Sequence, residues 1–106
     1  SCGALAVDPS QVQPDKFELL TNFPNPFNPT TNIIYTLSKH GEYSINIYNI
    51  NGMLIKNLVS GFGTPGEYKV MWDSCDNYGQ KVASGIYFYH LSTLSNITKN
   101  KMILLK

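Results

Sequence analysis

The sequence predicts an all-β fold in which two sheets pack face to face, and three observations support this class. Strong helix formers are scarce, with three alanines and three glutamates among 106 residues. Turn formers are abundant, with eleven asparagines, eight glycines and six prolines, and aromatic residues make up 12% of the chain. Short alternating segments recur about every 12 residues, a spacing typical of an immunoglobulin-like sandwich. A closed barrel is the alternative architecture.

The first 16 residues differ in texture from the rest. They show neither a helical nor a strand period, and Pro9 and Pro14 break any helix there. We therefore expect residues 1–16 to be an extended tail or linker, and residues 17–106 to form the single sandwich domain, which is all that a chain of this length can hold.

A short apolar segment from Phe17 ends at Pro24, where a proline-rich stretch begins. Three prolines within six residues fix φ and remove three amide donors, and the asparagines before two of them are driven to extended conformations. This predicts a stiff loop over 24–31, with Phe27 inserted into the core.

Six further segments alternate apolar and polar residues. They are Thr31–Leu37, Tyr43–Tyr48, Met53–Ser60, Glu67–Trp72, Gly85–Ser92 and Thr98–Lys106. Together with the segment from Phe17 they make seven predicted strands. Alternation groups side chains on one face of each strand: Ile33, Tyr35 and Leu37, then Tyr43, Ile45 and Ile47, then Tyr68, Val70 and Trp72, and then Tyr87, Tyr89 and Leu91, which lie opposite Ile86, Phe88 and His90. Among these residues Trp72 is expected in the core. Asn51-Gly52 predicts a type I′ hairpin turn, and Gly61–Gly66 predicts a loop.

Charge and hydropathy exclude two classes of protein. The net charge is +1, with eight lysines and no arginine, whereas nucleic-acid binders carry a basic excess. No apolar run approaches the roughly 20 residues of a membrane-spanning helix.

The sequence contains no strong motif for catalysis or metal binding. Two histidines, His40 and His90, are too few for a metal cluster, and no nucleophile elbow or phosphate loop occurs. Asp73, Asp76 and Asn77 offer oxygen ligands that suit calcium, but such residues in a turn more often cap backbone amides. We therefore expect no enzyme activity and no cofactor.

The two cysteines, Cys2 and Cys75, leave several states open. They can form one disulfide within the chain or between chains if the protein is exported, or remain free thiols. Cys2 is also placed as the lipid-modified cysteine of a processed lipoprotein would be, although Ser1 precedes it.

The tyrosines suggest a carbohydrate-binding platform as one hypothesis, because aromatic faces stack on sugars. The residues concerned are Tyr43, Tyr48, Tyr68, Tyr87 and Tyr89. The favoured interpretation is that most of them pack in the core or in cross-strand pairs.

Residues 23–37, FPNPFNPTTNIIYTL, resemble the opening of the type A C-terminal sorting domain of the type IX secretion system. The same pattern opens the related immunoglobulin-like domain of flagellar hook-capping proteins, and the stretches 47–61, 66–73, 79–91 and 101–106 agree with it in order. The residues that carry the resemblance are Pro24, Asn25, Pro26, Phe27, Asn28, Pro29, Gly52, Trp72, Asp73, Gly85 and Tyr87. Ser74-Cys75 departs from the family, which often has Gly followed by Arg or Thr.

The resemblance implies a seven-stranded sandwich on exported proteins of Bacteroidetes-like bacteria. There the domain is an address read by outer-membrane secretion proteins, and it is often cleaved after export to the cell surface or medium. We expect the address to be the last strand, because an edge strand presents unpaired backbone groups to a partner. Its residues are Lys101, Met102, Ile103, Leu104, Leu105 and Lys106.

Two other functions stay open at this point. A structural subunit would form a homo-oligomer, such as a filament or surface layer, by adding the apolar segment Ala4–Val7 to an edge of the next copy. A carbohydrate-binding module would use exposed tyrosines.

Overall fold

The computed structural model describes residues 20–106, which form seven strands and no helix. The strands are β2 (Leu20–Phe23), β3 (Thr31–Leu37), β4 (Gly41–Tyr48), β5 (Leu54–Gly63), β6 (Gly66–Trp72), β7 (Gly85–Thr93) and β8 (Ile97–Leu104). The predicted tail over 1–16 and the start of the predicted first strand lie outside the described residues. Within residues 20–106, no helix is available to cross a membrane.

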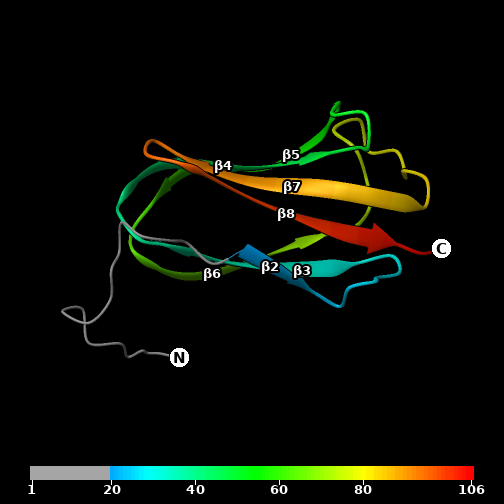
Figure 1. Cartoon of the computed structure of the whole chain (residues 1–106), viewed down its shortest axis with the longest axis horizontal. Helices are drawn as coiled ribbons and strands as arrows, with labels where there is room; N and C mark the ends of the chain where they lie inside the picture. Colours follow the sequence, from blue (N-terminus) through cyan, green and yellow to red (C-terminus); the bar gives the residue numbers. More distant parts are fainter. Residues whose placement is uncertain (1–19) are drawn as a thin grey trace.

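The strands form two antiparallel sheets that pack face to face (Figure 1). One sheet has the order β2-β3-β6 and the other has the order β5-β4-β7-β8. The chain passes from one sheet to the other after β3, after β5 and after β6, as in immunoglobulin-like sandwiches. The predicted sandwich is therefore confirmed, and the barrel alternative is wrong because the described strands form two separate sheets.

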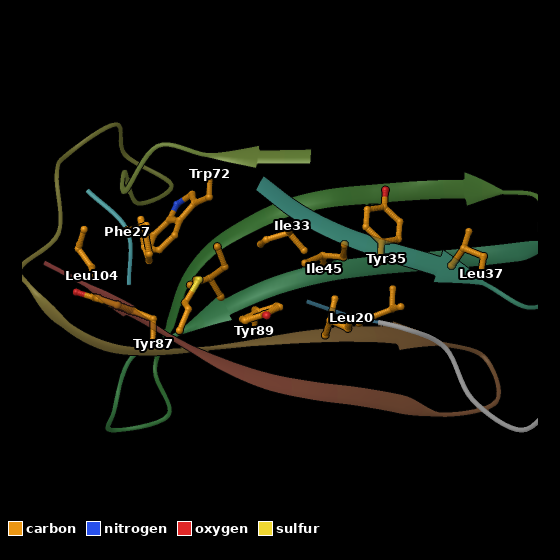
Figure 2. Close-up of a cluster of buried hydrophobic side chains, with 13 residues drawn as sticks. Leu20, Phe27, Ile33, Tyr35, Leu37, Ile45, Trp72, Tyr87, Tyr89 and Leu104 are labelled. Carbon is orange, nitrogen blue, oxygen red and sulfur yellow. The ribbon is translucent and has the colours of Figure 1, made fainter. Parts of the chain in front are cut away.

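The core lies between the sheets and follows the predicted alternation (Figure 2). On β3 every second residue from Thr31 to Leu37 is buried, and on β7 the same holds from Tyr87 to Leu91. The buried apolar residues are Leu20, Phe27, Ile33, Tyr35, Leu37, Ile45, Ile47, Trp72, Tyr87, Tyr89, Leu91, Met102 and Leu104. On β3, on the second half of β4 and on β7 the buried side chains fall on one of the two faces that the sequence period distinguishes, whereas β5 shows no such alternation.

One predicted loop is a strand. Residues 61–63 extend β5 beside β4, with Gly63 opposite Gly41, so only Thr64 and Pro65 link β5 to β6. Gly63 is buried, and a Cβ there would lie 2.5 Å from Cδ1 of Leu37. A Cβ at this position would displace the Leu37 and Tyr43 side chains, so Gly63 serves close packing in a strand and not a turn. The loop prediction was wrong because it treated this glycine as a turn residue.

The β4–β5 hairpin has a different turn from the one predicted. Gly52 has a φ of 82°, as expected, but Asn51 is not among the described residues with positive φ. The amide of Gly52 donates to the carbonyl of Asn49 at 2.9 Å, and the amide of Asn49 donates to the carbonyl of Met53 at 3.0 Å. Ile50 and Asn51 therefore occupy the centre of the turn and Gly52 follows them, whereas a type I′ turn needs positive φ at both central residues.

Candidate recognition surface

The C-terminal strand β8 is an edge strand of the four-stranded sheet and pairs with β7, with Met102 opposite Tyr87. Met102 and Leu104 are fully buried. The outward-facing or terminal side chains are exposed, and they are Lys101, Ile103, Leu105 and Lys106. The strand ends at Leu104, two residues before the predicted end. The predicted recognition segment, residues 101–106, therefore has two buried side chains that fix its position and four exposed side chains that a receptor can contact.

The outer edge of this half of β8 is closed by the proline-rich loop. The amide of Phe27 donates to the carbonyl of Ile103 at 3.0 Å, and the amide of Leu105 donates to the carbonyl of Phe27 at 2.9 Å. The Asn25 side chain accepts from the amide of Ile103 at 3.0 Å and donates to the carbonyl of Lys101 at 3.5 Å. The expectation of unpaired backbone along residues 101–105 is therefore wrong, since the loop takes the place of an added strand.

Phe27 anchors the loop by its side chain. Its ring is 2% exposed and lies 5.8 Å from the ring of Trp72, which is fully buried as predicted. Trp72 in turn contacts the edge of Tyr87 at 5.5 Å, and its indole Nε1 donates to the carbonyl of Cys75 at 2.9 Å. Figure 2 shows these three rings together at one end of the core, next to Leu104. Three residues of the family motif, Phe27, Trp72 and Tyr87, thus converge on the end of the core that supports the end of β8.

Polar contacts hold the two ends of the proline-rich loop. The hydroxyl of Thr31 donates to the carbonyl of Pro24 at 2.8 Å and accepts from Nδ2 of the Asn22 side chain at 3.0 Å. The hydroxyl of Ser74 is buried and donates to the carbonyl of Pro29. Ser74 has a φ of 68°, a conformation that favours glycine. The departure from the family pattern at this position therefore adds a hydrogen bond to the loop.

The candidate calcium ligands accept backbone amides, Asp73 and Asp76 within their own turn and Asn77 from Asn57 in β5. Oδ1 of Asp76 accepts the amides of Tyr78 and Gln80, both at 2.9 Å. The side-chain oxygens of Asp73 and Asn77 each accept one backbone amide. The capping interpretation is confirmed for all three residues. Within residues 20–106, no three side chains of His, Cys, Asp or Glu gather to hold a metal ion.

The cysteine prediction is tested only at one end. Cys75 is half-buried in the turn that follows β6, where its backbone pairs with that of Lys81 in an isolated antiparallel β-bridge. Cys2 lies outside the described residues, so the predicted disulfide stays a prediction.

The exposed side chains of β8 continue onto β7. Lys101 lies opposite Phe88, and Ile103 lies opposite Ile86 on the outer face of the sheet. Ile86 and Ile103 are 39% and 37% exposed, and Phe88 is half-buried. We call these four residues the β7–β8 face. Sequence alternation placed Ile86 and Phe88 on one face of the strand and Tyr87 and Tyr89 on the other, but only strand pairing brings Ile86 and Phe88 beside Ile103 and Lys101.

His90 lies farther along the same sheet face, with its ring 4.5 Å from that of Tyr48. Burial, and then the charge of Lys99 opposite it on β8, lower the pKa of His90. The neutral imidazole is therefore favoured in the folded state.

The tyrosines do not form one exposed platform. Tyr87 and Tyr89 are buried, and burial raises the pKa of both phenols. Tyr43 and Tyr68 pack against Tyr35, and the hydroxyls of Tyr35 and Tyr43 are 2.9 Å apart. The favoured interpretation, in which most of these residues are core or cross-strand partners, is confirmed.

This topology and core define an immunoglobulin-like β-sandwich domain. The chain belongs to the FlgD Ig-like domain family, whose model matches residues 28–96. No curated protein matches the chain.

Two solved structures from Porphyromonas gingivalis share the fold. Dimeric latent PorU is 22% identical, with a TM-score of 0.66 over 83% of this chain and 9% of PorU. PorZ, described as a surface component of the type IX secretion system, is 20% identical, with a TM-score of 0.56 over 82% of this chain and 11% of PorZ. The chain therefore spans about a tenth of the length of each protein, and at this identity the likeness concerns the fold.

Proposed function

We propose that the chain is a non-enzymatic sorting domain for type IX secretion. In this role the domain travels with an exported protein through the periplasm and is recognised by outer-membrane secretion and attachment proteins. The protein that carries it then reaches the cell surface or the medium. The domain itself supplies a surface for recognition and no reacting group.

The observation that carries this proposal is the arrangement of β8. The proline-rich loop and two buried side chains, Met102 and Leu104, hold the strand in one position. The side chains left outside are two apolar groups bracketed by Lys101 and Lys106. A fixed strand with an exposed pattern of this kind suits a receptor that reads side chains. The family match and the fold shared with a segment of PorZ agree with this role.

Closure of the β8 edge changes the expected mode of recognition. A receptor strand cannot pair with residues 101–105 while Asn25 and Phe27 occupy their backbone groups. Recognition therefore uses the β7–β8 face and the terminal lysine side chain. Apolar contact with Ile86 and Ile103 would supply affinity, and the lysines would supply charge complementarity to an acidic receptor surface.

The test replaces Lys101 and Lys106 together by Gln in the domain fused to a secreted reporter. Melting of the domain should barely change, because exposed charges contribute little to stability. Surface delivery of the reporter in a type IX-competent host should fall sharply. Replacement of the exposed Lys39 and Lys81 by Gln removes the same charge elsewhere and should leave delivery intact.

Normal delivery of the Lys101→Gln/Lys106→Gln variant would refute the lysine address. An equal loss of delivery in the Lys39→Gln/Lys81→Gln control would show that total charge, and not this strand, governs export.

A further inference from the structure

The edges of the sandwich differ in how they are covered. The four edge strands are β2, β5, β6 and β8. On one side, the loop closes the end of β8, and the Asn100 side chain donates to the carbonyl of Leu20 in β2 at 2.9 Å. On the other side, the amide of Asn77 donates to the carbonyl of Ile55, and its side chain accepts from the amide of Asn57, which covers the first half of β5. Three of the four edges are therefore at least partly capped.

Strand β6 is the exception. In the part of the chain that the structure describes, no backbone group of Gly66–Trp72 bonds to anything outside β3. The strand pairs with β3 over seven consecutive residues without a bulge, and it contains no proline. Natural edge strands are protected by bulges, prolines, covering loops or charged side chains, and of these β6 has only the charged side chains Glu67 and Lys69. Such charges oppose pairing with most strands, but a regular edge can still pair with a strand whose charges are complementary.

The charges on β6 have no partner within the described residues. Glu67 and Lys69 are both exposed, and they point to the outer face of the sheet two residues apart. Their neighbours on β3 are Thr36 and Ile34, and neither is charged. The strand therefore presents one negative and one positive side chain at its free edge, where a second strand with complementary charges could pair with them.

We propose that β6 pairs antiparallel with β6 of a second copy of this chain, in a register centred on Tyr68. A two-fold axis through that point places Glu67 of each copy opposite Lys69 of the other, on the same face. A register centred on Lys69 would set the two lysines directly opposite each other, which is unfavourable. The charges thus favour the register centred on Tyr68, in which the edges of two copies are complementary.

The dimer joins two three-stranded sheets into one sheet of the order β2-β3-β6-β6-β3-β2. Its interface is isologous, so both charge pairs form or fail together. Outside them, Met71 of each copy lies opposite Pro65 of the other. Cross-strand ion pairs contribute modestly, while the backbone hydrogen bonds of the new ladder supply most of the association.

The test measures the mass of the full chain by light scattering and sedimentation over a range of concentrations. We expect a monomer–dimer equilibrium in the wild type. Glu67→Lys and Lys69→Glu each set like charges opposite each other twice, and each should weaken self-association about tenfold or more. An equimolar mixture of the two variants restores both pairs, so it should form a heterodimer although neither variant dimerises alone.

Matched controls carry the same charge changes away from β6. Glu42→Lys on β4 and Lys99→Glu on β8, alone or mixed, should dimerise like the wild type. Amide hydrogen exchange gives a second readout, since β6 amides should gain protection only at concentrations where the dimer forms. A monomer at every soluble concentration would overturn the proposal, and so would a mixture that fails to associate. Concentration-independent protection of β6 would also overturn it, because the chain itself would then cover the edge.

Discussion

Replacement of Phe27 by Ala is expected to release the loop that closes the β8 edge. The Phe27 ring is 2% exposed and packs 5.8 Å from Trp72 at one end of the core. Truncation of a buried phenylalanine typically costs about 3–5 kcal/mol. Since a domain of this size is stable by only about 5–15 kcal/mol, the loss is a large fraction of the total.

The effect divides into a global part and a local part. One kcal/mol lowers Tm by about 4–8 °C in a domain of 60–100 residues, so even a loss of about 3 kcal/mol lowers Tm by about 12 °C. Locally, the amides of Ile103 and Leu105 bond to Asn25 and Phe27, so they should lose protection before the central strands do.

Thermal unfolding and amide hydrogen exchange measure the two parts. Phe23→Ala is the matched control, because Phe23 is 72% exposed and its truncation should change stability by no more than about 0.5 kcal/mol. If Phe27→Ala melts like Phe23→Ala, the ring does not anchor the loop. If the amides of Ile103 and Leu105 keep their protection relative to Ile45 of the central strand β4, the loop does not depend on this anchor.

Three further substitutions test the core and the titration of His90. Trp72→Ala should cost about 3–5 kcal/mol in denaturant unfolding, and a variant that melts within a few degrees of wild type would contradict its buried position. Gly63→Ala should destabilise the domain by about 1–3 kcal/mol, because the added Cβ meets core side chains, and a neutral effect on Tm would show that they yield freely. The lowered pKa of His90 means that the unfolded state takes up the proton first, so stability should fall as pH drops below about 6.5. His90→Gln should flatten Tm between pH 7.5 and 5.5 more than His40→Gln does, and equal slopes would refute this assignment.

Local sequence rules predicted much of the fold because alternation is a strong signal in strands. Tyr87, Tyr89 and Leu91 share one face of their strand, as the period of two requires, and that face is buried. Phe27 is buried as well, as expected for the one apolar side chain in a polar, proline-rich loop. The same rules failed at Gly63 and at Asn51, where the governing factor was the packing of a distant side chain or the register of the hairpin.

The candidate site was only half predictable for the same reason. The sequence indicated that β8 is a strand with one buried face, but not that Asn25 would bond to Ile103, a residue 78 positions away. Neither did any local signal link Ser74 to Pro29. Contacts of this kind depend on topology, and they decided whether the β8 edge was open.

Transport of a passenger tests the central claim most directly. The full chain of 106 residues, fused behind a signal peptide and a reporter, would be expressed in a type IX-competent bacterium and in a strain of it that lacks the secretion channel. Protease accessibility of the reporter on intact cells distinguishes the surface from the periplasm. The account predicts accessible reporter in the competent strain and periplasmic retention in the deficient one. Retention in both strains, or surface exposure in both, would contradict it.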